Sequence, residues 1–465
     1  MTRSGDEYLK SLKDRRIFLA GRAVRDPAVD PATARMARWL ADYLDLCCTS
    51  PVLSGEDGVP FSYALATDRT ELAARGRAFA DVARRSGGLL GRSPDFLATV
   101  LTGWRAAADH FGANAQRVVR YWEHARDRNL VLTHAISDPP ADRYLPGRTD
   151  ATARAVHAVR ETPEGLVVTG AKMLATLAPL ADELLVYPFR PLEESEADQA
   201  LCFAVPVNAP GLTLFCRPPL AGEVPGDRPL AERFDEMDAI CVFDEVLVHW
   251  DRVFIDRDVT VANTLRAGTD MTAYAWHQSA VRIWVKAEFV FELAHSCAEA
   301  SGRSGQPKVR EQLGELAGIA ETFRSLVVAA EAGAVADGRG HVIGDRVPLA
   351  AAGMLNATLY PRAVELLQLV VSSGLVMHPT TADEAPDSPA HAFFERYFAG
   401  DEVGALPHGE LLRMAADLTL SRFGGRQVLY ERVFLGPPDA FRAKFYGQYL
   451  DGRGVAGTVP DILSQ

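Results

Sequence analysis

The chain has 465 residues, of which 48% are hydrophobic and 24% are charged, which is typical of a globular protein with a large core. Its formal net charge of -12 argues against non-specific nucleic-acid binding, which needs basic surfaces. The charged N-terminal stretch and the lack of a long apolar run predict neither a secretory signal nor a membrane span. Six cysteines without CxxC spacing indicate no zinc site and no disulfide framework, so we expect a cytoplasmic protein with reduced thiols.

Residues 1–135 have a mostly helical pattern. PATARMARWLADYLDL places apolar residues three and four positions apart, as one buried helical face requires. SPDFLATVLTGWRAAADHF begins with Ser93 as an N-cap, Pro94 at the first helical position and Asp95 in the first turn. AQRVVRYWEHARDRN predicts another helix.

Residues 136–262 consist of short apolar runs separated by Gly and Pro. Five of these runs are typical of strands: GLVVTGAKML, DELLVYPF, ALCFAVPV, GLTLFCR and AICVFDEVLV. Their spacing predicts a compact β-domain, either a barrel or a sandwich.

Residues 263–465 return to long helical patterns. QLGELAGIAETFRSLVVAAEAGA has its apolar residues on one stripe, and MLNATLYPRAVELLQLVVSSG and GELLRMAADLTLSRFGG each end near Gly. We therefore predict an α+β protein with an N-terminal helical domain (1–135), a central β-domain (136–262) and a C-terminal helical bundle (263–465). This order is that of the acyl-CoA dehydrogenase-like fold, although a fold alone does not fix a function.

The chain has no P-loop, no GxGxxG after a strand, no HExxH and no GxSxG, so an enzyme of this sequence would rely on a cofactor. Two segments lie where helix gives way to strand. LTHAISDPPADRYLP contains His134 and a stiff loop, which is either a ligand-binding loop or a linker with a buried His. GAKMLATLAPL contains Thr176, whose hydroxyl either donates to a cofactor ring nitrogen or bonds its own backbone.

Three further segments are less specific. The acids of RFDEMDAICVFDEVLVHWDRVFI lack a paired His and are interpreted as structural rather than metal-binding. His277, among aromatic residues in AYAWHQSAVRIWVKAEF, is either a base for a phenol or a histidine of an interface or of the core. In SRFGGRQVLYERVFLG, a glycine pair ends a helix before Arg426, which suits a pyrophosphate or a simple C-cap.

Taken together, these segments resemble the oxygenase components of the 4-hydroxyphenylacetate 3-monooxygenase family, two-component aromatic hydroxylases that use reduced flavin. The similarity runs through EYLKSLKDRRIFLAGRAVRD, GRSPDF, THAISDPPADRYLP, VVTGAKMLAT, SSGLVMHP and RFGGRQVLYE, and so covers nearly the whole chain. The resemblance implies a homotetramer that takes FADH2 from a separate, diffusing reductase. It also implies that O2 forms a C4a-hydroperoxyflavin, which hydroxylates a small phenol ortho to its hydroxyl.

The resemblance also assigns roles to residues. Arg92 and His134 match the residues at the phenol hydroxyl, and His277 matches a base proposed in the chlorophenol- and nitrophenol-oxidising branch. The remaining positions match flavin contacts: Pro140, Ala141, Asp142, Arg143, Thr176, Gly424, Gly425 and Arg426.

The sequence differs from the family pattern at two places that concern substrate binding. The 4-hydroxyphenylacetate enzymes have Tyr at the position of Phe96, which cannot make that hydrogen bond. The loop that binds the substrate carboxylate in the family reads YPFRPLEESEAD here, with Phe189 and Arg190 as candidate substrate contacts. Arg190 is either a partner for a carboxylate, phosphate or carrier-protein arm, or an exposed loop charge.

We therefore predict an FADH2-dependent aromatic monooxygenase whose substrate is free or tethered to a carrier protein, with a role in specialised metabolism. Two alternatives remain at this point. One is oxidative dehalogenation or denitration of a substituted phenol, and the other is a catalytically inactive paralogue that serves as a binding subunit. Acyl-CoA dehydrogenase activity is disfavoured, since no catalytic Glu can be placed in the sequence.

Overall fold

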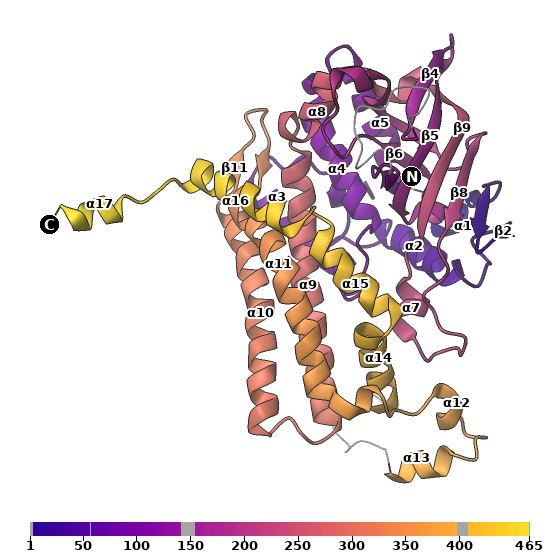
Figure 1. Ribbon diagram of the computed structural model, residues 1–465, viewed down its shortest axis with the longest axis vertical. Helices are drawn as coiled ribbons and strands as arrows, with labels where there is room; N and C mark the ends of the chain where they lie inside the picture. Colours follow the sequence, from indigo (N-terminus) through magenta and orange to yellow (C-terminus); the bar gives the residue numbers. More distant parts are fainter. Residues whose placement is uncertain (1–2, 56, 141–153, 398–407, 465) are drawn as a thin grey trace. The chain divides into compact units, whose positions relative to one another are not determined.

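The computed structural model describes residues 3–55, 57–140, 154–397 and 408–464 (Figure 1). The chain divides into two compact units, residues 1–278 with 336–342 and residues 279–335 with 343–465. Helix α9 (Met271–Ala300) begins in the first unit and continues into the second. The predicted order of helices, strands and helices is confirmed, while the three domain boundaries stay a prediction.

The first unit contains the helices that the N-terminal pattern predicts. α4 begins at Pro94, as the Ser-Pro signal indicates, and α2 and α5 match the other two predicted stretches. The helices of this unit before α9 are α1 (Gly5–Ser11), α2 (Ala34–Cys47), α3 (Arg69–Arg84), α4 (Pro94–Ala106), α5 (Ala115–Asp127), α7 (Pro229–Phe234) and α8 (Val259–Gly268).

The strands of the first unit form two sheets. One has the order β2-β1-β8-β9-β5-β4, and the other the order β10-β7-β6-β3. Their bounds are β1 (Ile17–Leu19), β2 (Arg22–Val24), β3 (Leu132–Ala135), β4 (His157–Glu161), β5 (Gly165–Thr176), β6 (Glu183–Val186), β7 (Leu201–Pro206), β8 (Leu212–Cys216), β9 (Asp238–His249) and β10 (Val253–Asp256). The five predicted strands are confirmed, whereas β1 and β2 lie in a region predicted to be helical.

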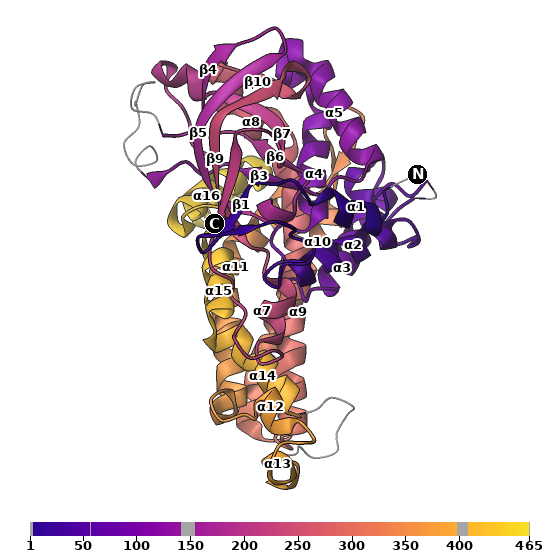
Figure 2. The ribbon, with the colours of Figure 1, turned by 90° about the vertical axis from the view of Figure 1, so that its right-hand side faces the viewer.

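The two sheets share one apolar core, so the β-domain is a sandwich. Phe203 of β7 and Phe243 of β9, from different sheets, meet edge to face with ring centres 6.1 Å apart. The barrel alternative is wrong, because the described strands pair as two separate sheets that do not close on each other. Helices α4 and α5 pack beside the four-stranded sheet through a second core (Figure 2). This packing brings α4 close to β3.

The second unit is helical, and α11 packs against α10, α14, α15 and α16. Its elements after α9 are α10 (Pro307–Ala332), α11 (Arg346–Val371), α12 (Thr381–Glu384), α13 (His391–Tyr397), α14 (His408–Leu420), α15 (Arg422–Val433), α16 (Pro438–Arg453) and α17 (Thr458–Leu463). The short strands β11 (Val335–Ala336) and β12 (Val342–Ile343) lie between α10 and α11 in sequence. The prediction that the C-terminal part of the chain is a helical bundle is confirmed.

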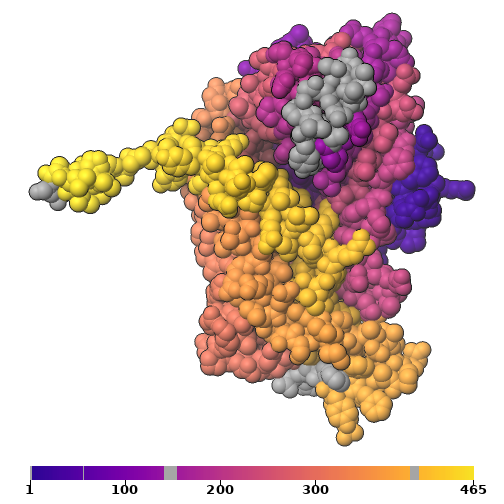
Figure 3. Space-filling view, viewed as in Figure 1, coloured from indigo at the N-terminus to yellow at the C-terminus, as the bar shows by residue number. Residues whose placement is uncertain are grey.

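Short 3₁₀ turns connect several of these elements, at Phe61–Tyr63, Ala108–Asn114, Ala178–Leu180, Glu194–Gln199, Trp250–Arg252 and Ser372–Leu375. The C-terminal segment with α17, yellow in Figure 3, lies at the surface, and α17 buries none of its residues. Within the described residues, no helix combines the length and the apolar character that crossing a membrane requires.

Candidate active site

Arg92, His134 and Tyr187 form a chain of hydrogen bonds in the first unit. Arg92 lies in the turn before α4, where its backbone amide donates to Glu236 at 2.6 Å. His134 lies on β3, and Tyr187 directly follows β6, which pairs in parallel with β3. Arg92 Nε is 3.0 Å from His134 Nε2, and His134 Nδ1 is 2.8 Å from the Tyr187 hydroxyl oxygen. Side chains from one turn and two neighbouring strands therefore converge.

Burial sets the protonation of this cluster. It lowers the pKa of His134 well below its ordinary value, and the positive charges of Arg92 and Arg266 lower that pKa further. Burial also raises the pKa of Tyr187 to about 12. At neutral pH His134 is therefore uncharged. Because Arg92 can only donate, His134 Nε2 accepts and the single ring proton lies on Nδ1.

Phe96 covers the cluster without adding a polar group. It lies on the first turn of α4, and its ring centre is 4.5 Å from the guanidinium carbon of Arg92. The His134 ring meets it nearly edge to face at 6.0 Å. The structure thus brings together Arg92, Phe96 and His134, three residues that the sequence places up to 42 positions apart.

The two candidate substrate contacts after β6 have different surroundings. The Phe189 side chain is 42% exposed, and Arg266 lies over its ring at 4.7 Å while donating to its carbonyl oxygen at 2.7 Å. Arg190 forms a two-pronged ion pair with Glu196, with its Nη1 at 2.8 Å from Oε2. The Arg190 side chain is only 16% exposed, so the exposed-charge alternative is wrong. Its contact with substrate stays a prediction.

Thr176 ends β5 and donates its hydroxyl proton to a neighbouring carboxylate. Its Oγ1 is 2.6 Å from Asp238 Oδ1, and Asp238 Oδ2 also accepts from Arg217 Nε at 2.7 Å. Asp238 was not predicted as the partner of Thr176. The two alternatives from the sequence were that the hydroxyl donates to a cofactor or that it donates to its own backbone. Because the proton is directed at Asp238, the Thr176 oxygen presents lone pairs, which suit an N–H donor.

Three acids at the start of the segment 233–255 bond to neighbouring groups of the protein, and one of them contacts the site. Asp235 and Asp238 both pair with Arg217. Glu236 accepts the backbone amide of Arg92 and so fixes the turn that carries it. Among the described parts of the chain, no group of His, Cys, Asp and Glu side chains is arranged to hold a metal ion.

The other predicted residues of the N-terminal half and of α9 either have surroundings of their own or lie outside the described residues. Pro140 is exposed and is the last described residue before the gap, and Ala141, Asp142 and Arg143 lie outside the described residues. His277, on α9, is fully buried, and its ring packs edge to face against Phe79 at 5.4 Å. These contacts fit the core-histidine alternative, and its catalytic role stays a prediction.

Gly424, Gly425 and Arg426 belong to the second unit. The expectation that the glycine pair ends a helix is wrong, because both residues lie in the first turn of α15. The Ser421 hydroxyl accepts from the amides of Phe423 and Gly424, and the Ser421 carbonyl accepts from Gly425. These amides are therefore already hydrogen-bonded within the chain. The predicted flavin contact of this segment is not tested by the structure of this unit.

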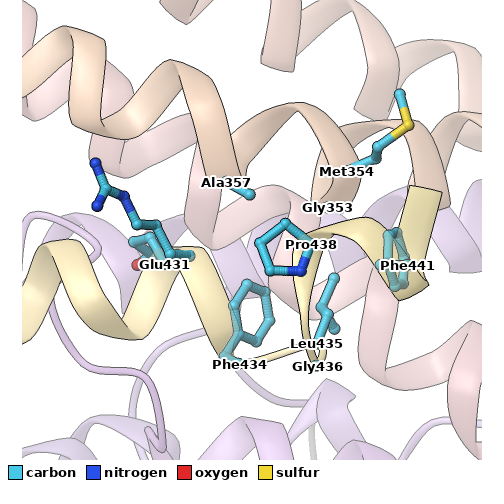
Figure 4. Close-up of a pocket in the computed structure, with 10 residues that line it drawn as sticks. Gly353, Met354, Ala357, Glu431, Phe434, Leu435, Gly436, Pro438 and Phe441 are labelled. Carbon is cyan, nitrogen blue, oxygen red and sulfur yellow. The ribbon is translucent and has the colours of Figure 1, made fainter.

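The second unit also holds a buried ion cluster that the sequence did not single out. Glu431 of α15 accepts from Arg282 Nη1 at 2.6 Å and from Lys286 Nζ at 2.6 Å, and all three are nearly inaccessible to solvent. The two cations hold the pKa of Glu431 down at about 2, against the effect of burial. A small hollow beside Glu431 is lined mainly by apolar residues such as Phe434, Leu435 and Phe441, as Figure 4 shows.

Three side chains of the site were not identified from the sequence: Tyr187, Glu236 and Arg266. The segment with Tyr187 was noted for Phe189 and Arg190, and Tyr187 is an aromatic residue two positions before Phe189 in that same segment. Glu236 and Arg266 carry no local signal, because their contacts join segments far apart in the sequence.

Comparison with known protein families gives two matches that together span most of the chain. Residues 4–255 match the family model described as 4-hydroxyphenylacetate 3-hydroxylase N terminal, and residues 262–453 match its C terminal counterpart. The chain is 36% identical over 460 residues to a 4-hydroxyphenylacetate 3-monooxygenase oxygenase component of Thermus thermophilus, covering 97% of this chain and 95% of the relative.

Other relatives differ in the substrate that they are named for. A 4-nitrophenol 2-monooxygenase oxygenase component of Rhodococcus is 34% identical, with 94% of this chain and 87% of the relative covered. A Streptomyces globisporus monooxygenase named for a (3S)-3-amino-3-(3-chloro-4-hydroxyphenyl)propanoyl group on a peptidyl carrier protein is 32% identical, with 93% and 85% covered.

Solved structures support the fold. The oxygenase component of 4-hydroxyphenylacetate 3-monooxygenase, complexed with FAD and 4-hydroxyphenylacetate, superposes with a TM-score of 0.89 at 35% identity, covering 96% of this chain and 95% of that one. An acyl-CoA dehydrogenase superposes at a TM-score of 0.51 and 13% identity, covering 97% of each chain, which confirms the fold class alone.

Proposed function

The chain belongs to the 4-hydroxyphenylacetate 3-hydroxylase family, and we propose that it uses reduced FAD and O2 to hydroxylate a phenol ortho to its hydroxyl group. The observation that carries this proposal is the contact between Arg92 Nε and His134 Nε2 at 3.0 Å. A phenol hydroxyl both donates and accepts hydrogen bonds. It can therefore insert between these two atoms, accepting from Arg92 and donating to His134.

This arrangement makes the aromatic ring of the substrate electron-rich, because it favours loss of the phenol proton. His134 is neutral and presents the Nε2 lone pair, so it can accept the phenol proton. Arg92 keeps its positive charge and stabilises the phenolate oxygen that remains. The flavin, when bound, supplies the activated oxygen atom from O2. The edge of Phe96 and the body of Tyr187 keep this region largely dry, which strengthens both interactions.

The described residues fit a reduced flavin at one point. A reduced flavin ring carries an N–H group at N5, and the Thr176 oxygen is available to accept from it because its own proton goes to Asp238. The family resemblance assigns further cofactor contacts to Pro140 to Arg143 and, separately, to Gly424 to Arg426 of the second unit. A separate reductase that releases reduced FAD by diffusion, and assembly into a homotetramer, complete the proposal.

The substrate is a phenol, free or carried by a peptidyl carrier protein, and both kinds occur in the names of relatives. Phe96 removes a hydrogen bond that simple phenols receive elsewhere in the family, so a substrate with further anchoring groups fits this site better. Phe189, Arg190 and Arg266, the last of which lies over the Phe189 ring at 4.7 Å, are the residues that we propose to bind such a group.

The direct test is a turnover assay. The full chain, a flavin reductase, NADH, FAD and O2 are incubated with a panel of para-substituted phenols, including the carrier-bound form of a β-tyrosine, and products are identified by mass spectrometry. A mass gain of one oxygen at the ortho carbon is expected for at least one phenol. Release of halide or nitrite would instead indicate dehalogenation or denitration, and failure to bind reduced FAD would indicate an inactive binding subunit.

Two arginine variants distinguish a loss of catalysis at the site from a general effect on the folded protein. Arg92→Met removes the charge at the phenol oxygen and should lower kcat by about a hundredfold. Arg85→Met changes the same residue type in an exposed ion pair with Asp81 and should leave kcat within about twofold. Equal losses in the two variants would contradict the role of Arg92.

A further inference from the structure

His134 can work as a base only if its proton is on the correct nitrogen. A neutral imidazole carries one proton, and the Nε2 lone pair is available only while that proton stays on Nδ1. The contact of Nε2 with Arg92, which can only donate, shows that this tautomer is present. Some group must accept the Nδ1 proton, because an unpaired buried N–H is unfavourable.

The Tyr187 hydroxyl is that group. Its oxygen is 2.8 Å from His134 Nδ1, and the two rings meet at a centre distance of 5.8 Å. Tyr187 is 2% exposed, and its ring also packs edge to face against Trp104 of α4 at 5.4 Å. The hydroxyl therefore has a fixed position next to His134, held by the end of β6 and by the helix that begins after Arg92.

From this geometry we infer that Tyr187 is a positioning residue that keeps the Nε2 lone pair of His134 directed at the substrate hydroxyl. The inference rests on the proposed function and adds a residue to its site. In the proton transfer, the phenol O–H bond breaks, its electron pair stays on the phenol oxygen, and the proton bonds to His134 Nε2. The Nδ1 proton stays in place, and its hydrogen bond to Tyr187 strengthens as the ring becomes cationic.

Other charged groups around His134 do not replace this role. Arg92 and Arg266 are cations and cannot accept the Nδ1 proton, although both favour the phenolate. The Glu236 carboxylate accepts the backbone amide of Arg92. Phe96 presents only its ring. Among the described side chains, Tyr187 is the acceptor that the structure places at Nδ1.

The test measures the ionisation of a bound phenol, which does not depend on turnover. 4-Nitrophenol absorbs visible light as its anion, so titration of the protein-bound probe gives the pKa of its hydroxyl. Tyr187→Phe should raise this pKa by about one unit and lower kcat about tenfold, because one hydrogen bond to the ionised site is weakened. KM should change by less than about threefold, since the ring of Tyr187 is kept.

Two controls make the result specific. Tyr121→Phe removes another buried tyrosine hydroxyl, which donates to Glu183 at 3.0 Å, and should leave the pKa of the bound probe unchanged. In a His134→Ala background, Tyr187→Phe should cause no further change, because Tyr187 acts through His134. An unchanged probe pKa in Tyr187→Phe, or an equal shift in the His134→Ala background, would overturn the inference. Failure of the proposed function has a different signature, namely the absence of hydroxylated product from the wild-type protein.

Discussion

Asp95 provides a test of the electrostatics next to the candidate site. It lies in the first turn of α4, beside Phe96, and is 2% exposed. Its Oδ2 is 3.3 Å from Gln278 Nε2. Burial raises the pKa of this carboxyl from 3.8 to about 6, although hydrogen bonds from Ser93, Gln278 and two backbone amides oppose the shift.

The magnitude follows from linkage. A pKa difference of about two units between the folded and unfolded states corresponds to about 3 kcal/mol. Between about pH 4 and pH 6 the folded protein keeps a proton that the unfolded chain releases, so this group makes folding less favourable as the pH rises. Below about pH 4 the ionisation of Asp95 no longer affects the free energy of unfolding, and above about pH 6 it lowers that free energy by the full amount. Asp95→Asn removes the ionisation and should therefore stabilise the protein at pH 8 but not at pH 4.

The assay compares urea unfolding of the wild-type protein and Asp95→Asn, followed by tryptophan fluorescence, at several pH values from 4 to 8. The gain in the free energy of unfolding should grow by about 3 kcal/mol across this range. Asp251→Asn, at a position where the side chain is 83% exposed, serves as the control and should change it by less than about 1 kcal/mol at each pH. A difference for Asp95→Asn that is independent of pH would refute the assignment of a raised pKa.

Three further predictions concern the site and the second unit. Phe96→Tyr adds a hydroxyl beside Arg92 and His134 and should raise kcat for simple para-substituted phenols about tenfold in steady-state assays. Thr176→Val removes the oxygen next to Asp238 and should weaken reduced-FAD binding about tenfold in anaerobic titrations, with more peroxide released per NADH. Glu431→Gln leaves Arg282 and Lys286 buried without their carboxylate and should lower the free energy of unfolding by about 3–5 kcal/mol in urea.

Each of these predictions has a result that would contradict it. No gain for Phe96→Tyr would mean that the site is shaped for a different substrate. Unchanged flavin binding in Thr176→Val would remove Thr176 from the cofactor contacts. The matched control for Glu431→Gln is Glu315→Gln, which breaks a half-exposed ion pair with Arg362. If both variants lower the free energy of unfolding by a similar amount, the burial of Glu431 is not the cause of its effect.

Several features follow from the local sequence because local forces set them. The Ser-Pro start of α4, the amphipathic α5 and the five apolar runs of the β-domain depend on residues a few positions apart, and all of them match the structure. β1 and β2 escaped prediction because each has only three residues, and β1 is stabilised by pairing with the distant β8. The glycine pair was misplaced because the Ser421 cap, rather than the glycines, sets the helix boundary.

The sequence by itself determined the order of helices and strands and, through motif resemblance, singled out Arg92, His134 and Thr176 as candidate site residues. Only the tertiary structure decided what these side chains contact. Parallel pairing of β3 with β6 brings Tyr187 to His134, and the turn held by Glu236 brings Arg92 to the other ring nitrogen. The Glu196 contact of Arg190 and the Asp238 contact of Thr176 likewise depend on the folded backbone. A hydrogen bond requires two atoms within about 3 Å, and for residues far apart in the chain only the folded backbone provides that proximity.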